Sequence, residues 1–336
     1  MRIAVDAMGG DKAPGEIIRG VLEAAERFDD VEFLLAGIPE RISEFLPGAS
    51  VPSIEVVACT QVVAMDESPV EAIRRKKDSS LRRVFELVAS GEAQAVVSAG
   101  NTGATVAAAS MLVGPLDGCK RPGIAVTLPS RGGHTVVIDA GANLSPKPLH
   151  LLHYGLMAQI FAREVLGAEN PSVGLLSVGE EREKGTDLVR AAHDLFARHV
   201  PGFTGNCEGR DVFNGSVDVV VCDGFTGNVI LKATEGYASY LVSTLVENIA
   251  RAVPANHKKL KSFIIDFVAQ NDYREHGGAP LLGMSAPTII CHGSSNATAI
   301  SNAISVAHEF AKHDVNARIV EALGRLEISN HTGDAK

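Results

Sequence analysis

One segment of the sequence has residue types and spacing that could bind an anion. The β-branched run 219–221 is typical of a buried strand, and Asp223-Gly224 follows it, where a turn forms easily. Gly227 allows the backbone to approach another group closely, and Asn228 stands where a helix is expected to start. Because a strand, a glycine turn and a helix N-terminus present backbone N–H groups to an anion, we expect phosphate or an oxyanion to bind here.

Three other strand-like runs are also followed by turns that pair glycine with a small polar residue. Each turn alone is explained by backbone conformation, because glycine and asparagine tolerate positive φ. Together they indicate a shared site, since the carboxyl ends of parallel strands lie at one edge of a sheet. The candidate binding residues are Asp6, Gly9, Gly10, Asp11, Gly100, Asn101, Thr102, Gly103, Asn143, Thr226 and Gly227.

Two charged segments allow a functional interpretation. The run 179–187 reads as a solvated helix start, but Lys184 beside Gly185 could hold phosphate as a point charge. A basic cluster reads as a solvated helix face, or as a dock for phosphate, a phosphopantetheine arm or an acidic carrier protein. Its members are Arg74, Arg75, Lys76, Lys77, Arg82 and Arg83.

The segment 257–268 places lysines beside a dense apolar patch. Such a stretch is usually a helix in a core or a subunit interface, but basic and bulky apolar residues together are also typical of a helix lying on an anionic membrane. The candidate membrane contacts are Phe263, Ile264, Ile265 and Phe267.

The elements that must position these residues follow a repeated order of apolar strand, glycine-containing turn and helical pattern. This alternation predicts an α/β fold with a largely parallel sheet, and the nearly continuous apolar strands indicate burial on both faces. The expected strands are 2–7, 31–36, 54–58, 95–98, 135–139, 173–178, 217–222 and 288–291.

The composition limits the class of protein. The 336 residues carry a net charge of −9, which argues against general nucleic-acid binding. We find no apolar run that would cross a bilayer, and residues 1–6 enter a strand-like pattern without a signal peptide's apolar core, so a cytoplasmic location is expected. The five cysteines form no C-x-x-C pair and therefore predict neither a disulfide framework nor a zinc site.

Familiar catalytic fingerprints are missing from the sequence. There is no G-x-x-x-x-G-K-S/T phosphate loop, no G-x-G-x-x-G after the first expected strand and no G-x-S-x-G elbow. His292 follows an expected strand and could lie near the ligand, although a structural role is the commoner one for such a histidine.

The motifs, taken in order, resemble the PlsX family of phosphate acyltransferases, which are acyl-ACP:phosphate transacylases. The resemblance covers essentially the entire chain. It is carried by segments 5–11, 98–104, 179–185, 206–211, 223–228, 273–283 and 292–295.

The resemblance implies a doubly wound α/β/α sandwich of the isocitrate/isopropylmalate dehydrogenase type, related to phosphotransacetylases. We expect residues 1–328 to form one catalytic unit, which could be divided into two lobes around a cleft. Residues 253–275 would be a projecting apolar and basic segment, and residues 329–336 a frayed tail.

The resemblance also implies the reaction and the partners. Inorganic phosphate would attack a long-chain acyl thioester on acyl carrier protein, giving acyl phosphate for phospholipid synthesis by a downstream glycerol-3-phosphate acyltransferase. The protein would be a homodimer at a peripheral membrane surface, with neither a metal nor another cofactor. The catalytic residues would be Lys184, holding phosphate, and Asn228, donating to the oxyanion. The basic cluster would dock the carrier protein.

Three alternatives remain at this point. A phosphotransacetylase acting on a short acyl-CoA would share the chemistry. A dehydrogenase of the isopropylmalate type would share the fold, but should carry clustered metal-binding aspartates, which we do not find. A scaffold that recruits carrier protein to membranes would bind the carrier without turnover.

Overall fold

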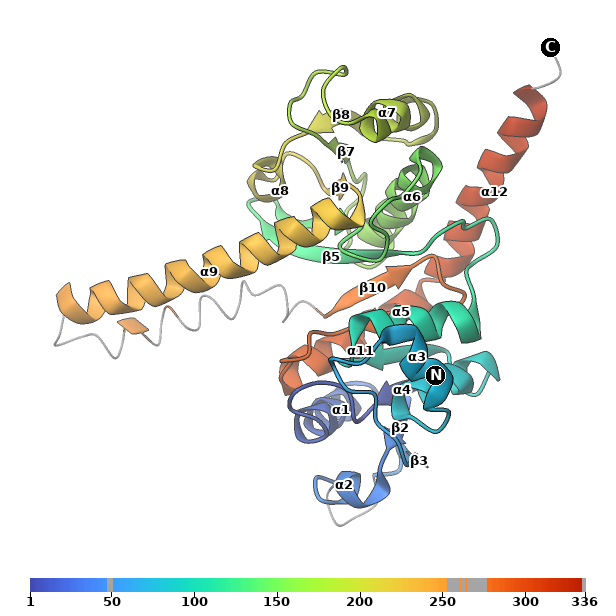
Figure 1. The fold of residues 1–336 in the computed structure, drawn as a ribbon, viewed down its shortest axis with the longest axis vertical. Coiled ribbons are helices and arrows are strands. Elements are labelled where there is room, and N and C mark those ends of the chain that lie inside the picture. Colours follow the sequence, from blue (N-terminus) through green and yellow to red (C-terminus); the bar gives the residue numbers. More distant parts are fainter. Residues whose placement is uncertain (47–50, 253–259, 262–263, 265–276, 334–336) are drawn as a thin grey trace.

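A computed structural model describes residues 1–46, 51–252, 260–261, 264 and 277–333 of the chain. Within these residues the strands form one sheet of eleven, in the order β3-β2-β1-β4-β11-β10-β5-β6-β9-β7-β8 (Figure 1). The strands are β1 (Arg2–Asp6), β2 (Glu32–Gly37), β3 (Ile54–Ala58), β4 (Ala95–Ser98), β5 (Gly123–Ser130), β6 (Gly133–Ile138), β7 (Val173–Leu176), β8 (Phe203–Cys207), β9 (Val219–Val221), β10 (Ala279–Leu282) and β11 (Thr288–Ile290).

The strand pairing is mostly parallel, as the sequence predicts, but its direction reverses in the middle of the sheet. Strand β10 is antiparallel to both β11 and β5, and β5 is antiparallel to β6. The strands of the first half, β1 to β4 with β11, therefore run opposite to β6, β9, β7 and β8. The carboxyl ends of the two halves therefore point in opposite directions and meet where the halves join, so the glycine turns do not lie along one edge of a parallel sheet, as expected, but face one another across β10 and β5.

Helices cover both faces of the sheet and complete three layers. The helices are α1 (Gly15–Arg27), α2 (Pro39–Ser43), α3 (Pro69–Arg75), α4 (Ser80–Ala89), α5 (Thr102–Ala108), α6 (Pro148–Glu164), α7 (Asp187–His199), α8 (Asp211–Asn214), α9 (Gly224–Ala252), α11 (Ala297–Lys312) and α12 (Val315–Gly333). Helix α5 continues into a short π-helical stretch, η1 (Ala109–Val113).

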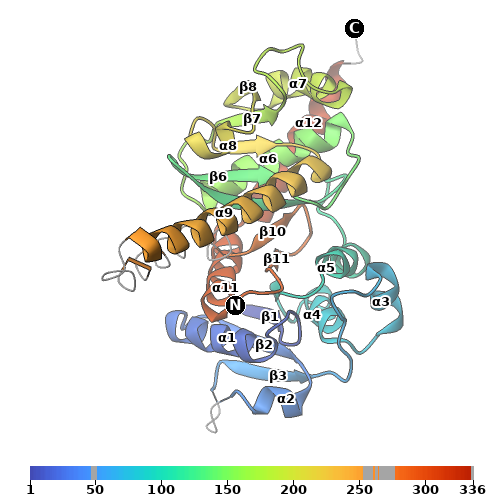
Figure 2. The same cartoon turned by 60° about the vertical axis from the view of Figure 1, so that its left-hand side comes forward.

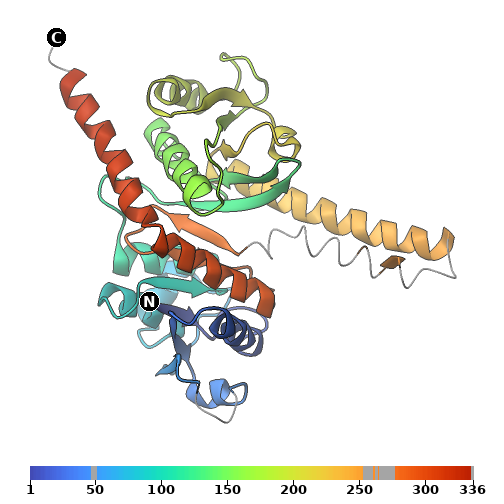
Figure 3. The same ribbon diagram turned by 180° about the vertical axis from the view of Figure 1, so that it is seen from behind.

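The core follows from the alternation of side chains along the strands. In β1, Ala4 packs into a cluster with α4 and α5, whereas Ile3 and Val5 pack on the other face with α1 and α11. The cluster on the α4–α5 face continues through both halves of the sheet, to Val137 and Val220. The opposite face of the second half is covered by α6, α7 and α12 (Figure 3).

The eight expected strands are all present, and their ends differ from the expected ones by no more than two residues. The strands that were not expected are β5, β8 and β10. Strand β8 contains Gly205 at a φ of +98°, and β5 and β10 each contain a proline, so none of them reads as a continuous apolar run.

Helix α9 is the longest described helix and extends away from the body of the molecule (Figures 1 and 2). Its outer part exposes several large side chains, with Tyr237 65% and Tyr240 62% exposed and Leu241 and Leu245 over two-fifths exposed. Among the described residues, none of the helices combines the length and the apolar character that spanning a bilayer requires.

The candidate membrane contacts fall mainly outside the described residues. Of the four, only Ile264 is described, as a half-buried helical residue, whereas Phe263, Ile265 and Phe267 are not. At the other end of the chain, α12 extends to Gly333, beyond the predicted start of a tail at residue 329.

Candidate active site

A cavity of about 210 Å³ lies where the two halves of the sheet meet. It sits over β5, β10 and β11, between the start of α5 and the second turn of α9, and Figure 1 shows β10 and β5 between these two helices. At about 30 Å³ per water, this volume corresponds to about seven waters, enough for a phosphate group and a thioester. The lining residues are Thr102, Ile124, Val126, Ala140, Gly141, Asn228, Leu231, Lys232, Glu235, Gly278, Ala279, Ile290, Cys291 and His292.

The turn after β6 is built around a buried carboxylate, Asp139. Its Oδ1 accepts hydrogen bonds from the backbone N–H groups of Ile124 at 3.0 Å, Gly141 at 3.1 Å and Ala142 at 2.9 Å. Its Oδ2 accepts from the N–H of Asn143 at 2.7 Å. Burial raises the pKa of Asp139, and these backbone bonds oppose the rise. Asp139 was not among the predicted residues, although an acid shortly before Gly141 was a signal for such a turn.

The predicted binding residue Asn143 supports this turn. Its Nδ2 donates to the carbonyl oxygen of Pro122 at 2.6 Å and to the hydroxyl of Tyr154 at 2.8 Å. Because its amide is engaged within the protein, Asn143 holds the loop that presents Gly141 to the cavity.

The start of α9 differs from the sequence expectation. The helix begins at Gly224, so Asn228 lies in its second turn instead of at its first residue. The carboxylate of Asp223 accepts hydrogen bonds from the N–H of Thr226 at 2.9 Å and from the Thr226 hydroxyl at 2.7 Å. The Asp223 side chain therefore caps the N-terminus of α9. Thr226 and Gly227 therefore belong to the first turn of α9, and they are not among the residues that line the cavity.

Gly227 permits a close approach to backbone. A Cβ at this position would lie 2.0 Å from the carbonyl oxygen of Asp139, so the end of β6 and the start of α9 touch where only glycine fits. Asn228 then lies beside Gly141, where an added Cβ would be 3.7 Å from atoms of the Asn228 side chain. The structure thus brings Asn228 into the cavity against the turn after β6.

The glycine turns of the first half pack against one another. Asp6 is buried, and its carboxylate accepts from the N–H of Met8 at 3.2 Å and the hydroxyl of Ser98 at 2.9 Å, while burial raises the pKa of Asp6. A Cβ on Gly9 would lie 2.7 Å from the nitrogen of Gly100, so these two predicted residues meet backbone to backbone. Gly10, at a φ of +102°, packs against the carbonyl of residue 293.

The turn after β4 places one predicted residue at the cavity. Asn101 caps α5, its Oδ1 accepting from the N–H of Ala104 at 2.9 Å, and its Nδ2 donates to the carbonyl of Met65 at 2.8 Å. Thr102 is exposed and lines the cavity, whereas Gly103 packs against Pro69 of α3. Asp11 is exposed and its N–H donates to the carbonyl of Gly293 at 2.7 Å.

The cationic residue at the cavity is Lys232, which follows Asn228 by one helical turn and forms an ion pair with Glu235 at 2.8 Å. The predicted phosphate-binding Lys184 is exposed in the connection between β7 and α7 and is not among the cavity residues. The role of Lys184 therefore stays a prediction.

The basic cluster divides into anchored and exposed residues. Lys76 donates to the carbonyl of Val62 at 2.7 Å and pairs with Glu67, and Arg82 donates to the carbonyl of Ile73 at 3.0 Å. The exposed members are Arg74, Arg75, Lys77 and Arg83.

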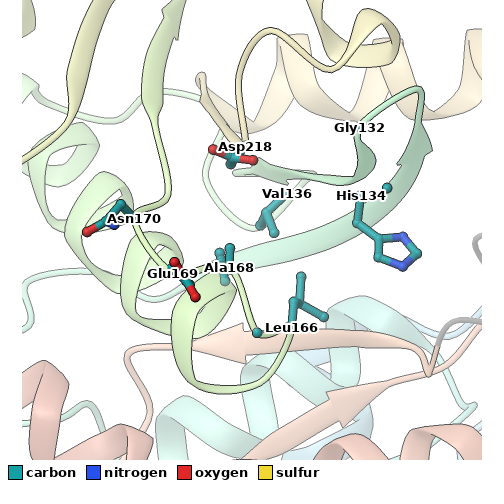
Figure 4. Close-up of a pocket in the computed structure, with 11 residues that line it drawn as sticks. Gly132, His134, Val136, Leu166, Ala168, Glu169, Asn170 and Asp218 are labelled. Atoms are coloured by element: carbon teal, nitrogen blue, oxygen red, sulfur yellow. The ribbon is translucent and has the colours of Figure 1, made fainter.

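A second cavity, of about 380 Å³, lies in the second half of the molecule (Figure 4). It is lined by His134, Asn170 and Asp218, close to where β6, β7 and β9 begin. Asn228 and the turn at Asp139 follow the other ends of these strands, so this cavity is separate from the candidate active site.

Known proteins resemble the chain over nearly its whole length. Residues 1–318 match a family model described as a fatty acid synthesis protein. A phosphate acyltransferase of Halothermothrix orenii is 46% identical over 331 residues, which cover 97% of this chain and 99% of that protein.

Solved structures support the same fold. A phosphotransacetylase from Streptococcus pyogenes superposes with a TM-score of 0.60 at 17% identity, covering 93% of this chain and 94% of that chain. A 4-hydroxythreonine-4-phosphate dehydrogenase from Klebsiella pneumoniae gives a TM-score of 0.51 at 15% identity, covering 93% and 97%. The predicted α/β/α fold, related to phosphotransacetylases and to a dehydrogenase fold, is confirmed.

Proposed function

The chain belongs to the fatty acid synthesis protein family, with phosphate acyltransferases among its relatives, and on this premise we propose that it moves a long-chain fatty acyl group from acyl carrier protein to inorganic phosphate. The acyl phosphate product would serve phospholipid synthesis. The observation that carries the proposal is the position of Asn228 and Lys232, one helical turn apart on the wall of a cavity of about 210 Å³.

The chemistry needs two reactants held together and one developing charge stabilised. An oxygen of phosphate attacks the carbonyl carbon of the thioester, and the carbonyl electrons move to oxygen to give a tetrahedral oxyanion. Collapse of this intermediate breaks the carbon–sulfur bond, and the pantetheine thiolate leaves. Asn228 donates its amide N–H to the oxyanion, which favours the transition state over the ground state.

Phosphate requires a cation, and two lysines are candidates. Lys184 is the candidate from the family resemblance, and Lys232 is the one that lines the cavity. Lys232 is paired with Glu235, and phosphate would replace that carboxylate as its partner.

The surface beside the cavity supports the proposal that acyl carrier protein is the acyl donor. Helix α3 exposes Arg74 and Arg75 and packs through Pro69 against Gly103 in α5, whose first residue lines the cavity. An acidic carrier protein bound there would bring its pantetheine arm to the entrance of the site.

We also propose a homodimer. The outer part of α9 exposes aromatic and aliphatic side chains that no other described element covers, and a second copy of the chain would bury them.

The proposed activity is tested by trapping the product. The protein is incubated with palmitoyl-carrier protein and phosphate, and acyl phosphate is captured with hydroxylamine as the hydroxamate. Asn228→Ala should reduce kcat about 10²- to 10³-fold, the usual effect of removing one oxyanion donor, while the variant stays folded. Asn170→Ala, at the separate cavity of Figure 4, is the matched control and should retain wild-type rates.

Parallel assays test which lysine binds phosphate and which thioester is the acyl donor. Lys184→Ala and Lys232→Ala are compared for the loss of phosphate affinity, and palmitoyl-CoA and acetyl-CoA replace the carrier thioester as donors. A wild-type protein that yields no phosphate-dependent hydroxamate from the carrier thioester contradicts the proposed function. Full activity with acetyl-CoA alone would instead identify a short-chain phosphotransacetylase.

A further inference from the structure

His292 lies on the cavity wall, and neither phosphate binding by a lysine nor oxyanion binding by Asn228 involves it. It follows β11 and lines the cavity from the first half of the sheet, whereas Asn228 reaches it from the second half. The residue is exposed, although its backbone belongs to a closed turn in which the N–H of Ser295 donates to the carbonyl of His292 at 2.9 Å.

The imidazole ring is held on one side only. Its Nδ1 accepts a hydrogen bond from the backbone N–H of Ser294 at 3.2 Å and lies 2.8 Å from the Ser294 hydroxyl. A backbone N–H can only donate, so Nδ1 must carry a lone pair and the neutral ring carries its proton on Nε2. In the described part of the chain Nε2 has no hydrogen-bond partner.

The turn that carries the ring is fixed in place. The carbonyl of Gly293 accepts from the N–H of Asp11 at 2.7 Å. Backbone packs closely against this turn, since a Cβ on Gly10 would lie 2.9 Å from the carbonyl oxygen of Gly293. The donor at Nε2 is therefore oriented before a substrate arrives, which is the condition for effective electrostatic stabilisation.

We propose that His292 is a catalytic residue that donates its Nε2–H to the thioester carbonyl oxygen, opposite the amide of Asn228. The inference rests on the proposed acyl transfer to phosphate. As the bond from phosphate to carbon forms, the carbonyl electrons move to oxygen, and the two donors share the charge. No proton is transferred by the ring, and the donor bonds weaken again when the carbon–sulfur bond breaks and the carbonyl re-forms.

This geometry requires one donor from each half of the molecule for the same oxygen. It also assigns Ser294 a positioning role, because its N–H selects the tautomer that makes Nε2 a donor.

The test uses two substitutions of His292 that keep different hydrogen-bonding groups of the imidazole ring. His292→Asn keeps an oxygen near Nδ1 that can accept from Ser294 but removes the donor at Nε2, whereas His292→Gln can place an amide N–H near the Nε2 position. With the hydroxylamine assay we expect His292→Asn to lower kcat about 10²- to 10³-fold with little change in KM for phosphate, and His292→Gln to recover part of that loss. His134→Ala, at the separate cavity of Figure 4, is the control and should behave as the wild type.

A purely structural His292 predicts a different pattern. His292→Asn would then keep its activity, and a rate within about threefold of the wild type overturns the proposal while leaving the proposed function intact. A wild-type protein without acyl phosphate formation overturns both.

The tautomer is measured separately, by the ¹⁵N chemical shifts of His292 in the wild-type protein at about pH 8. We expect the neutral ring to be protonated at Nε2, and a ring protonated at Nδ1 overturns the inference whatever the kinetics show. Thermal unfolding of each variant establishes that it is folded.

Discussion

At the scale of single residues, Cys291 raises the question of which group attacks the thioester. Its thiol lies on the wall of the cavity and could in principle form an acyl-enzyme. Burial raises the pKa of Cys291 to about 12, so that only about one thiol in ten thousand is ionised at pH 8. The thiolate is the nucleophilic form, and its scarcity supports direct attack by phosphate.

We therefore expect Cys291→Ala to retain activity. Mass spectrometry should find no acyl group on the protein during turnover. In the folded wild type, alkylation of Cys291 by iodoacetamide should be slow at pH 8 and rise about tenfold per pH unit, because the thiolate fraction does so below a pKa of about 12. Rapid labelling of Cys291 at neutral pH in the folded protein would contradict this description.

Asn228 was predictable from the sequence, but the group that positions it was not. An amide after a glycine turn is a recognisable local signal, and it identified Asn228. Asp139 acts through contacts with residues 124 and 227, which are distant in the sequence, and no local pattern reports those contacts. Lys232 was missed for a similar reason, since its place on the cavity depends on where α9 crosses the sheet.

At the scale of elements, the contact between the end of β6 and the start of α9 sets the position of Asn228. Gly227→Ala would place a methyl group 2.0 Å from the carbonyl oxygen of Asp139. Either the helix or the turn must shift, which we expect to cost about 1–3 kcal/mol of unfolding free energy. Activity should fall as well, because Asn228 is the next residue.

A matched control lies on the same helix. A Cβ on Gly236 would meet nothing within 4 Å, so Gly236→Ala should leave activity unchanged and stabilise α9 by about 0.5–1 kcal/mol. Urea unfolding measures both free energies. Equal stability of the two variants would show that the close approach at Gly227 does not matter.

The elements themselves were largely predictable, but their directions were not. Apolar runs and glycine turns revealed the eight expected strands, because each of these signals is local. The reversal depends on β10 and on the β5–β6 hairpin. Of these three strands, β5 and β10 each contain a proline. Because the sequence pattern does not reveal β5 and β10, it predicts that all the turns lie at a single edge of the sheet.

At the scale of the whole molecule, the outer part of α9 exposes large side chains that no other described element covers. Leu241 and Leu245 lie one helical turn apart on a helix that extends away from the body, and Tyr237 precedes them by another turn. We expect Leu241→Glu to weaken the proposed dimer, because a buried unpaired carboxylate is costly at an apolar interface.

Sedimentation equilibrium measures the change in mass. The wild type should sediment as a dimer and Leu241→Glu should shift toward the monomer at the same concentration. Ser239→Glu, an exposed polar position on the same helix, is the control for added charge. A wild type that sediments as a monomer, or a variant with unchanged association, would contradict the dimer through this surface.

The reversal at the centre of the sheet also determines which parts of the chain the two halves need. The second half takes β5 to β9 from one continuous stretch, residues 123–221. The first half takes β1 to β4 from the beginning of the chain, but its neighbour strand β11 and the helix α11 come from residues 288–312. A chain cut before residue 288 would leave β4 with an unpaired edge and the cavity without its His292 wall. The N-terminal stretch is thus not a separable module, since its last strand and one side of the site are encoded far along the chain, beyond the whole of the second half.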